Sequence, residues 1–174
     1  CLNFLKDKPI KKKIFTSHGV IPALEQPVEG ADKYVSVSEE VQSNLKSKKF
    51  ESIIIRNPVD TERFKATSPV NSTLKNVLFI SNYQGPALNV IMQACNGLNL
   101  QVIGSQRREW DIPKFMNWAD LVISLGRGCY EAMACERNVF VFDYNGGDGM
   151  VTPESILDFR KNNCSGRRYK KQYF

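Results

Sequence analysis

A glycine–arginine–glycine segment follows an apolar run in the second half of this 174-residue chain, and its residue types suit phosphate binding. Residues 120–125 predict a strand, and residues 130–135 predict a helix with Glu131 in its first turn. A strand, a tight loop and a helix N-terminus leave backbone N–H groups facing outward, where they bind anions. The donors expected here belong to Gly126, Arg127, Gly128 and Cys129. Arg127 adds a guanidinium that can hold phosphate through two hydrogen bonds.

Purely structural interpretations of these residues are also open. Arg127 can be a solvated loop residue, although its place before a helix favours the phosphate role. Glu131 can simply be an acid that interacts well with the helix dipole. A helix N-terminus can lower the pKa of the Cys129 thiol, but we favour a small residue that fills a turn, because the chain has no second histidine to pair with it.

Glycine, small polar and basic residues also follow other predicted strands. They include His18 after residues 12–17, Asn82 and Tyr83 after 76–81, Arg107 and Arg108 after 100–104, and Gly146, Gly147 and Asp148 after 139–143. Right-handed crossovers bring the carboxyl ends of parallel strands to one edge, where open α/β sheets bind ligands. We therefore expect a ligand site at this edge. Arg107 and Arg108 can equally be surface charge, and residues 145–149 can be a glycine turn that needs positive φ.

Strands and helices alternate along the chain, and this order predicts the fold class. Further strands are expected at residues 33–37 and 51–56, and the composition of the second of these predicts that it is buried. Helices are expected after Ser38, at residues 87–96, after Asp111 and from residue 152. Such alternation predicts an α/β, Rossmann-like parallel sheet with helices on both faces. Residues 66–73, rich in Ser, Thr, Pro and Asn, are the best linker candidate.

Composition and charge narrow the class of protein. No apolar run reaches the roughly 20 residues of a membrane span, and the first residues lack both a signal-peptide core and an initiator Met, so we expect a fragment. Five scattered cysteines and one histidine disfavour a zinc site and suggest a reducing, cytoplasmic setting. The net charge of +6 lies largely near the two ends. We favour solvated flanks over nucleic-acid binding, with peripheral membrane contact as the alternative.

Two motifs resemble one enzyme family. Val35-Ser36-Val37-Ser38 followed by Asn57-Pro58-Val59-Asp60 and Phe64 resembles the hinge region of retaining glycosyltransferases with the GT-B fold. Glu131-Ala132-Met133-Ala134, followed by the strand at 139–143, is similar to the donor-binding helix and next strand of those enzymes. The resemblance runs from about residue 15 to about residue 160. It implies that residues 1–69 are the end of an acceptor-side domain and that residues 70–174 are the donor domain.

The resemblance also implies roles for particular residues. Glu131 matches the glutamate that binds ribose hydroxyls, and His18 matches an active-site histidine that faces the cleft. The second glutamate common in the family, which contacts the donor sugar, is missing, because Ile123 and Ser124 stand near its place. The loop with Asn82 and Tyr83 carries no lysine or arginine for the diphosphate, and Arg107 and Arg108 are candidates to compensate. Gly146, Gly147 and Asp148 are candidates to contact the donor sugar.

The function implied is transfer of a sugar from a UDP- or GDP-sugar to a glycan or lipid-linked acceptor, retaining and independent of a metal. The nucleotide sugar is a substrate, and no cofactor is expected. Three other classes stay open. They are a nucleotide-sugar epimerase of the same architecture, a non-catalytic nucleotide-sugar-binding module, and a nucleic-acid binder with a basic surface, whose affinity would fall steeply with salt.

Overall fold

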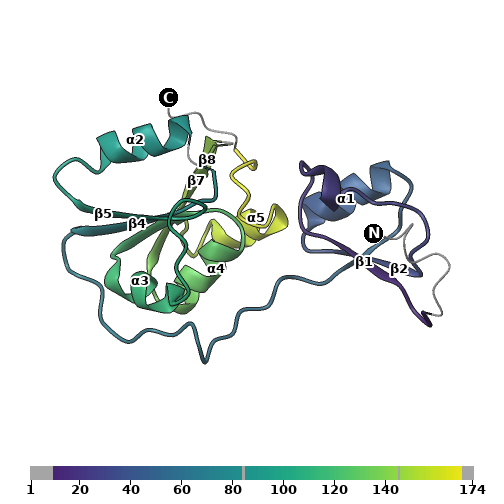
Figure 1. Cartoon of the computed structure of the whole chain (residues 1–174), viewed down its shortest axis with the longest axis horizontal. Helices are drawn as coiled ribbons and strands as arrows, with labels where there is room; N and C mark the ends of the chain where they lie inside the picture. The colour runs from purple at the N-terminus through teal and green to yellow at the C-terminus, as the bar shows by residue number, and fades with distance from the viewer. Residues whose placement is uncertain (1–9, 84, 145, 170–174) are drawn as a thin grey trace. The chain divides into compact units, whose positions relative to one another are not determined.

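The computed structural model describes residues 10–83, 85–144 and 146–169, and it divides into two compact units. The first unit comprises residues 1–57 and the second comprises residues 58–174, of which only the described parts are discussed (Figure 1). The division after Asn57 lies earlier in the chain than the boundary at 69/70 that the sequence suggests. Among the described residues, no helix has both the length and the apolar character that crossing a membrane requires.

The first unit is a three-stranded parallel sheet with one α-helix. Its elements are β1 (Ile14–Ser17), the 3-10 helix η2 (Ala23–Glu25), β2 (Lys33–Ser36), α1 (Glu39–Ser47) and β3 (Ile53–Ile54), and the strand order is β1-β2-β3. Ser38 begins α1 as predicted, because its hydroxyl accepts a hydrogen bond from the N–H of Val41 at 3.3 Å. Val41 and Leu45 of α1 pack with Tyr34 in the small core of this unit.

The predicted strand at residues 51–56 is wrong in its length and its burial. Only Ile53 and Ile54 pair with β2, and the side chain of Ile53 is 57% exposed. Ile53 pairs with Val35, on the face opposite to that of Tyr34, which packs against α1. The apolar sequence therefore marks a strand, but the strand is short and the Ile53 side chain stays exposed although its neighbour Val35 is buried.

The second unit is a five-stranded sheet with helices on both faces, as predicted. Its elements are β4 (Asn76–Ile80), α2 (Pro86–Ala94), β5 (Asn99–Ile103), α3 (Ile112–Trp118), β6 (Leu121–Ser124), α4 (Arg127–Ala134), β7 (Asn138–Asp143), β8 (Gly146–Met150) and α5 (Ile156–Lys161). The strand order is β5-β4-β6-β7-β8, and the first four strands are parallel. Val77 and Phe79 pack under α2, whereas Leu78 and Val122 pack with α3, α4 and α5 on the opposite face (Figure 1).

Strand β8 replaces the glycine turn that the sequence predicts. Asn145 lies outside the described residues, but Gly146, Gly147 and Asp148 are buried in β8, which runs antiparallel to β7. Glycine is required at position 147, since a Cβ there would lie 2.5 Å from the carbonyl oxygen of Val141. Gly147 therefore permits close strand pairing, whereas Gly146 and Gly149 have the positive φ values, 87° and 94°, that were predicted for glycines here.

Residues 58–75 contain no helix or strand, yet they are fixed to the second unit. Phe64 is buried in the core beside Leu78 and Met116. The buried carboxylate of Asp120 accepts four hydrogen bonds of 2.8–3.0 Å. Three come from this segment, from the N–H and side-chain amide of Asn71 and the N–H of Lys75, and the fourth comes from the N–H of Asn76 at the start of β4. Residues 58–75, which include the stretch predicted as a linker, therefore pack against the second unit, and we call this segment the strap.

Two predicted helix starts differ from the structure. Asp111 does occupy the position before α3, but its side chain makes no capping hydrogen bond. The proposed start at Thr152 is a turn instead, in which the carbonyl of Thr152 accepts the N–H groups of Ser155 and Ile156, and α5 begins at Ile156. The predicted capping bond is therefore absent at Asp111 but present at Thr152, whose hydroxyl accepts the N–H of Ser155 at 3.3 Å.

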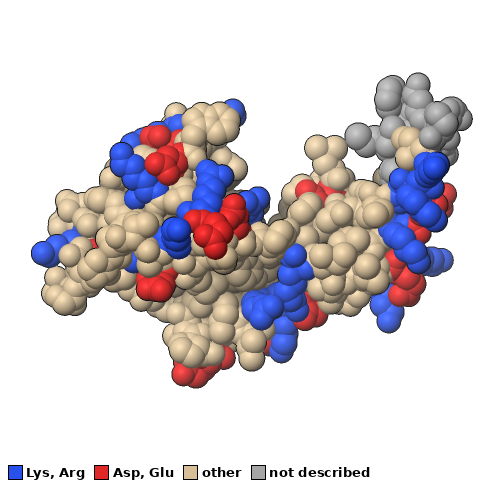
Figure 2. All heavy atoms as spheres, turned by 90° about the horizontal axis from the view of Figure 1, so that it is seen from below, with Lys and Arg blue, Asp and Glu red and all other residues tan. Residues whose placement is uncertain are grey.

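Basic residues of the described part are often paired with acids. Arg168 binds Asp158 through two hydrogen bonds of 2.7 and 3.0 Å, and Lys161 lies 3.2 Å from the same carboxylate. These contacts lower the pKa of Asp158 to about 2. Figure 2 shows basic and acidic side chains in mixed groups on the face in view. Lys6, Lys8, Lys170 and Lys171 belong to the predicted basic flanks and lie outside the described residues.

Candidate functional site

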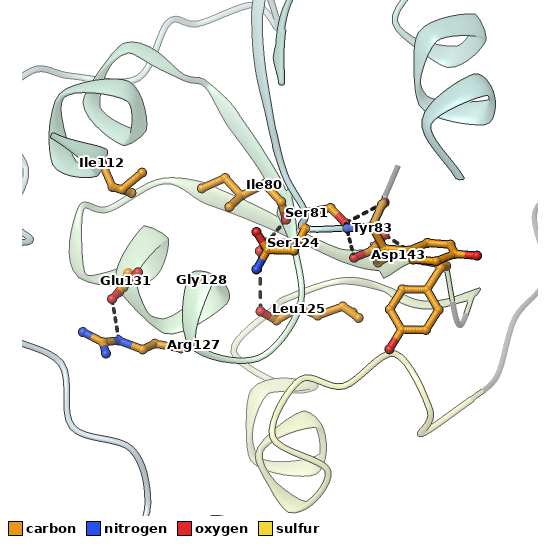
Figure 3. A pocket seen from close by; sticks show the side chains of 12 residues that line it. Ile80, Ser81, Tyr83, Ile112, Ser124, Leu125, Arg127, Gly128, Glu131 and Asp143 are labelled. Carbon is orange, nitrogen blue, oxygen red and sulfur yellow. Dashed lines mark hydrogen bonds and ion pairs between the residues drawn. The ribbon is translucent and has the colours of Figure 1, made fainter. Parts of the chain in front are cut away.

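A cavity of about 560 Å³ lies in the second unit where parallel strands end and α4 begins (Figure 3). Its position at the carboxyl ends of β4, β6 and β7 is the one expected for a ligand site in an open α/β sheet. The lining residues are Ile80, Ser81, Asn82, Tyr83, Ile112, Ser124, Leu125, Arg127, Gly128, Glu131, Asp143 and Tyr144. Five of them were predicted as site residues from the sequence, namely Asn82, Tyr83, Arg127, Gly128 and Glu131.

The loop between β6 and α4 is shorter than predicted, because α4 begins at Arg127. Gly126 precedes the helix with a φ of 57°, a conformation that favours glycine. Its N–H donates to the carbonyl of Cys164 at 2.9 Å, and the N–H of Cys129 donates to the carbonyl of Gly126 at 3.1 Å. Two of the four predicted anion donors are therefore used within the protein. The N–H groups of Arg127 and Gly128 belong to the first turn, which has no earlier helical carbonyl to bind.

Gly128 lets the start of α4 lie directly against the end of β6. A Cβ at this position would be 2.4 Å from the hydroxyl oxygen of Ser124. The Ser124 hydroxyl in turn donates to the carbonyl of Ile80 at 3.1 Å, which joins the ends of β6 and β4. Gly128 is thus required by packing, and the same packing brings the first turn of α4 to the cavity wall.

Arg127 and Glu131 pair with each other at one side of the cavity. The Nε atom of Arg127 lies 2.6 Å from Oε1 of Glu131, one helical turn further along α4 (Figure 3). The arginine side chain is 62% exposed, whereas that of the glutamate is only 13% exposed. Each group keeps bonding capacity beyond this pair, since a guanidinium has five N–H donors and a carboxylate has two acceptor oxygens. A phosphate and a pair of hydroxyl groups are ligands that such an arrangement can hold.

A hydrogen-bonded cluster at the other side of the cavity joins β4 to β7. The hydroxyl of Ser81 donates to Oδ2 of Asp143 at 2.6 Å and accepts the N–H of Tyr83 at 3.0 Å. The N–H of Tyr144 donates to Oδ1 of Asp143 at 2.8 Å. Burial raises the pKa of the Asp143 carboxyl, and the hydrogen bonds from Ser81 and Tyr144 oppose this rise in part. One carboxylate therefore fixes the backbone at both tyrosines.

Tyr83 and Tyr144 also contact each other through their rings. The ring centroids are 4.7 Å apart and the planes are inclined by 49°. Both side chains border the cavity, and the two residues are 53% and 42% exposed. An aromatic pair of this kind offers an apolar surface with hydroxyls at its rim, which suits a ring-shaped polar ligand.

The remaining predicted site residues are not among the residues that line this cavity. Arg107 binds Glu109 at 3.0 Å and lies over the ring of Phe115, and Arg108 is exposed. Gly146, Gly147 and Asp148 are buried in β8. His18 belongs to the first unit, where its N–H donates to the carboxylate of Glu25 at 2.6 Å and the residue is exposed. Within the second unit, Arg107, Arg108, Gly146, Gly147 and Asp148 are not among the residues that line the cavity with Arg127 and Glu131.

Cys129 is buried in the core and does not line the cavity, which agrees with its role as a small packing residue. Its thiol donates to the carbonyl of Ser124 at 3.3 Å. Burial and the neighbouring thiol of Cys164 raise its pKa well above the ordinary value, so the helix N-terminus does not produce a reactive thiolate here. Among the residues that the structure describes, no group of three His, Cys, Asp or Glu side chains is arranged to hold a metal ion.

The sequence reasoning missed several lining residues, above all Ser81, Ser124, Asp143 and Tyr144. Each stands within the last two positions of a predicted strand or directly after one, so strand ends themselves carried the signal. Their partnership depends on strand order, since β6 lies between β4 and β7 in the sheet. No protein-family model matches this chain, and a search of curated proteins finds no match.

Proposed function

We propose that the second unit binds a nucleoside-diphosphate sugar as the donor half of a glycosyltransferase. The observation that carries the proposal is the cavity at the carboxyl edge of the sheet, with the first turn of α4, Arg127 and Glu131 in its wall. Its volume of about 560 Å³ lies within the range typical of small-molecule sites. The resemblance of residues 131–134 and 57–60 to GT-B enzymes supports a nucleotide sugar as the ligand.

In this proposal the charged residues stabilise the departing diphosphate. Negative charge develops on the phosphate oxygens when the bond between the sugar and the diphosphate breaks, and fixed donors aimed at that charge lower the barrier. Arg127 and the first-turn N–H groups of Arg127 and Gly128 would bind the diphosphate. Glu131 would accept the ribose hydroxyls with the oxygen capacity that the Arg127 contact leaves.

Calorimetric titration tests the donor site directly. The unmodified chain would be titrated with UDP, GDP, ADP and inorganic pyrophosphate, and so would the Arg127→Ala and Glu131→Ala variants. We expect Arg127→Ala to weaken nucleoside diphosphate and pyrophosphate alike, by roughly 10- to 100-fold, because a charge-assisted hydrogen bond to phosphate is lost. Glu131→Ala should weaken the nucleotides about 10-fold and leave pyrophosphate affinity nearly unchanged, because pyrophosphate has no ribose.

A second acid–base pair provides the matched control. Lys65 and Glu62 lie 3.9 Å apart on the surface, outside the lining of this cavity, and Lys65→Ala and Glu62→Ala should leave every affinity unchanged. Failure of the unmodified chain to bind any of the nucleotides would refute the proposal. Nucleotide binding that survives both Arg127→Ala and Glu131→Ala would place the site elsewhere.

A further inference from the structure

We propose that Tyr83, Tyr144 and Asp143 form the subsite for the donor sugar, an inference that rests on the proposed nucleotide-sugar site. The sugar ring would pack against the tyrosine pair, by which we mean Tyr83 and Tyr144, and a sugar hydroxyl would donate to the carboxylate of Asp143. The sequence lacks the acid that related enzymes use for this purpose, since Ile123 and Ser124 stand near its place. The structure provides a different carboxylate from the end of another strand.

The layout of the cavity separates a charged side from an aromatic side. Figure 3 shows Arg127 and Glu131 on one side, Tyr83 and Asp143 on the other, and Ser81 and Ser124 between them. A ligand with its ribose at Glu131 and its diphosphate at the first turn of α4 would extend toward the tyrosine pair. In a nucleotide sugar, the sugar is attached to the diphosphate at the end opposite to the ribose. The sugar would therefore reach the tyrosine pair and Asp143.

The chemistry of the aromatic side suits a sugar better than a further phosphate. Asp143 and the two tyrosines provide a carboxylate, two hydroxyls and two aromatic rings, and none of the three residues carries a positive charge. A carboxylate accepts hydrogen bonds from hydroxyl groups and repels phosphate. Aromatic rings provide apolar contact for the C–H faces of a saturated ring while their polar edges stay near water.

The same contacts hold the subsite in a defined shape without a ligand. Asp143 accepts one hydrogen bond on each oxygen, from Ser81 at 2.6 Å and from the N–H of Tyr144 at 2.8 Å. Ser81 in turn accepts the N–H of Tyr83 at 3.0 Å. A carboxylate has about four acceptor positions, so it can take a ligand hydroxyl in addition. Such pre-positioning reduces the entropy lost when a ligand binds.

The test compares one ligand pair in several variants. The dissociation constants of UDP and UDP-glucose, or of GDP and GDP-mannose if only GDP binds, would be measured for the unmodified chain, for Asp143→Asn and for Tyr83→Ala with Tyr144→Ala. We expect each change to weaken the nucleotide sugar about 10-fold relative to the matching diphosphate, because the lost contacts touch the sugar alone. The diphosphate affinity itself should change less than about 3-fold, which also shows that each variant is folded.

Controls separate this inference from the proposed function. Trp110→Ala removes another exposed aromatic residue that does not line the cavity, and it should leave both affinities unchanged. If the diphosphates bind but the ratio of the two affinities is the same in every variant, the sugar subsite is refuted and the donor site stands. If no diphosphate binds, both proposals fail. If the conservative changes Tyr83→Phe and Tyr144→Phe reproduce the loss, the hydroxyls and not the ring faces hold the sugar, which overturns the stacking role.

Discussion

The guanidinium of Arg127 lies 2.6 Å from the carboxylate of Glu131, one turn along α4, so these two charged groups at one side of the cavity neutralise each other. The arginine of this pair is largely exposed, and surface pairs at this spacing contribute only about 0.3–0.5 kcal/mol to stability. Their pairing therefore holds both side chains at the cavity wall at little energetic gain. A ligand that binds either group can replace or share the contact without a large loss in folding free energy.

Arg127→Ala should accordingly leave the fold intact. We expect the free energy of unfolding to fall by less than about 0.5 kcal/mol, since the arginine is exposed and Glu131 can be solvated at the cavity. Urea unfolding followed by tryptophan fluorescence measures this, because Trp110 and Trp118, the two tryptophans of the chain, both lie in the second unit. A loss above about 1.5 kcal/mol would contradict the view that this pair serves binding more than stability.

Asp120→Ala should destabilise the second unit far more. The substitution removes the acceptor for four hydrogen bonds and leaves N–H groups of Asn71, Lys75 and Asn76 without that partner. We expect a loss of about 2–4 kcal/mol in urea unfolding by tryptophan fluorescence. Asp111→Ala is the matched control, because that side chain makes no capping bond and its loss should cost less than about 0.5 kcal/mol. Equal effects of the two changes would show that the strap is not held by Asp120.

The contribution of Asp120 should also depend on pH. Burial alone would raise its pKa, but the N–H groups of Asn76, Asn71 and Lys75 outweigh burial and hold it below the ordinary value. A carboxylate with a depressed folded-state pKa stabilises the protein above its unfolded value of about 3.9, and this stabilisation is lost as the pH falls through the folded pKa. The stability difference between the unmodified chain and Asp120→Asn should therefore be largest near neutral pH and shrink below about pH 4. Unfolding curves at pH 6, 5, 4 and 3 measure it, and a difference that stays constant would contradict the assignment.

Gly128→Ala should disturb the junction of β6 and α4. The new Cβ would lie 2.4 Å from the Ser124 hydroxyl oxygen, and overpacking of this kind typically costs about 1–3 kcal/mol. The higher helix propensity of alanine offsets up to about 1 kcal/mol of that cost. We expect a net loss of about 1–2 kcal/mol in thermal or urea unfolding.

Two further variants define that effect. Adding Ser124→Ala should recover part of the loss, because it removes the oxygen that the new methyl group meets. Gly19→Ala is the matched glycine control, since its Cβ would meet only Pro22 at an ordinary 3.5 Å, and it should be neutral within about 0.5 kcal/mol. If Gly128→Ala leaves the free energy of unfolding unchanged, β6 and α4 can shift apart at little cost, and the prediction is wrong.

Local sequence patterns predicted most of the secondary structure. Apolar runs located the four parallel strands of the second unit, and Ser38 followed by two glutamates marked the start of α1. Such patterns depend on neighbours in the chain and on one buried face, so they can be read without knowing the fold. They also placed the phosphate-binding hypothesis at a real cavity, because a strand end followed by a helix start has a fixed position in a parallel sheet.

Features that depend on distant residues were not predicted. The glycines of β8 resemble a turn until β7 is placed beside them, where the close approach to Val141 requires glycine at position 147. The Asp143–Ser81 bond joins residues from β7 and β4, which are separated in the sheet by β6. No spacing rule within one segment contains such information, since strand order is a property of the assembled sheet.

The attachment of residues 58–75 to the second unit also determines where the chain can be exchanged with a related one. A chimera joined at Asn57 and Pro58 would inherit Phe64 together with the core around Leu78, and Asn71 together with Asp120. A chimera joined after residue 69 would pair a foreign residue at position 64 with a core shaped for phenylalanine. Recombination between such folds would thus be tolerated before the strap and penalised within it, although the strap contains the residues that most resemble a linker.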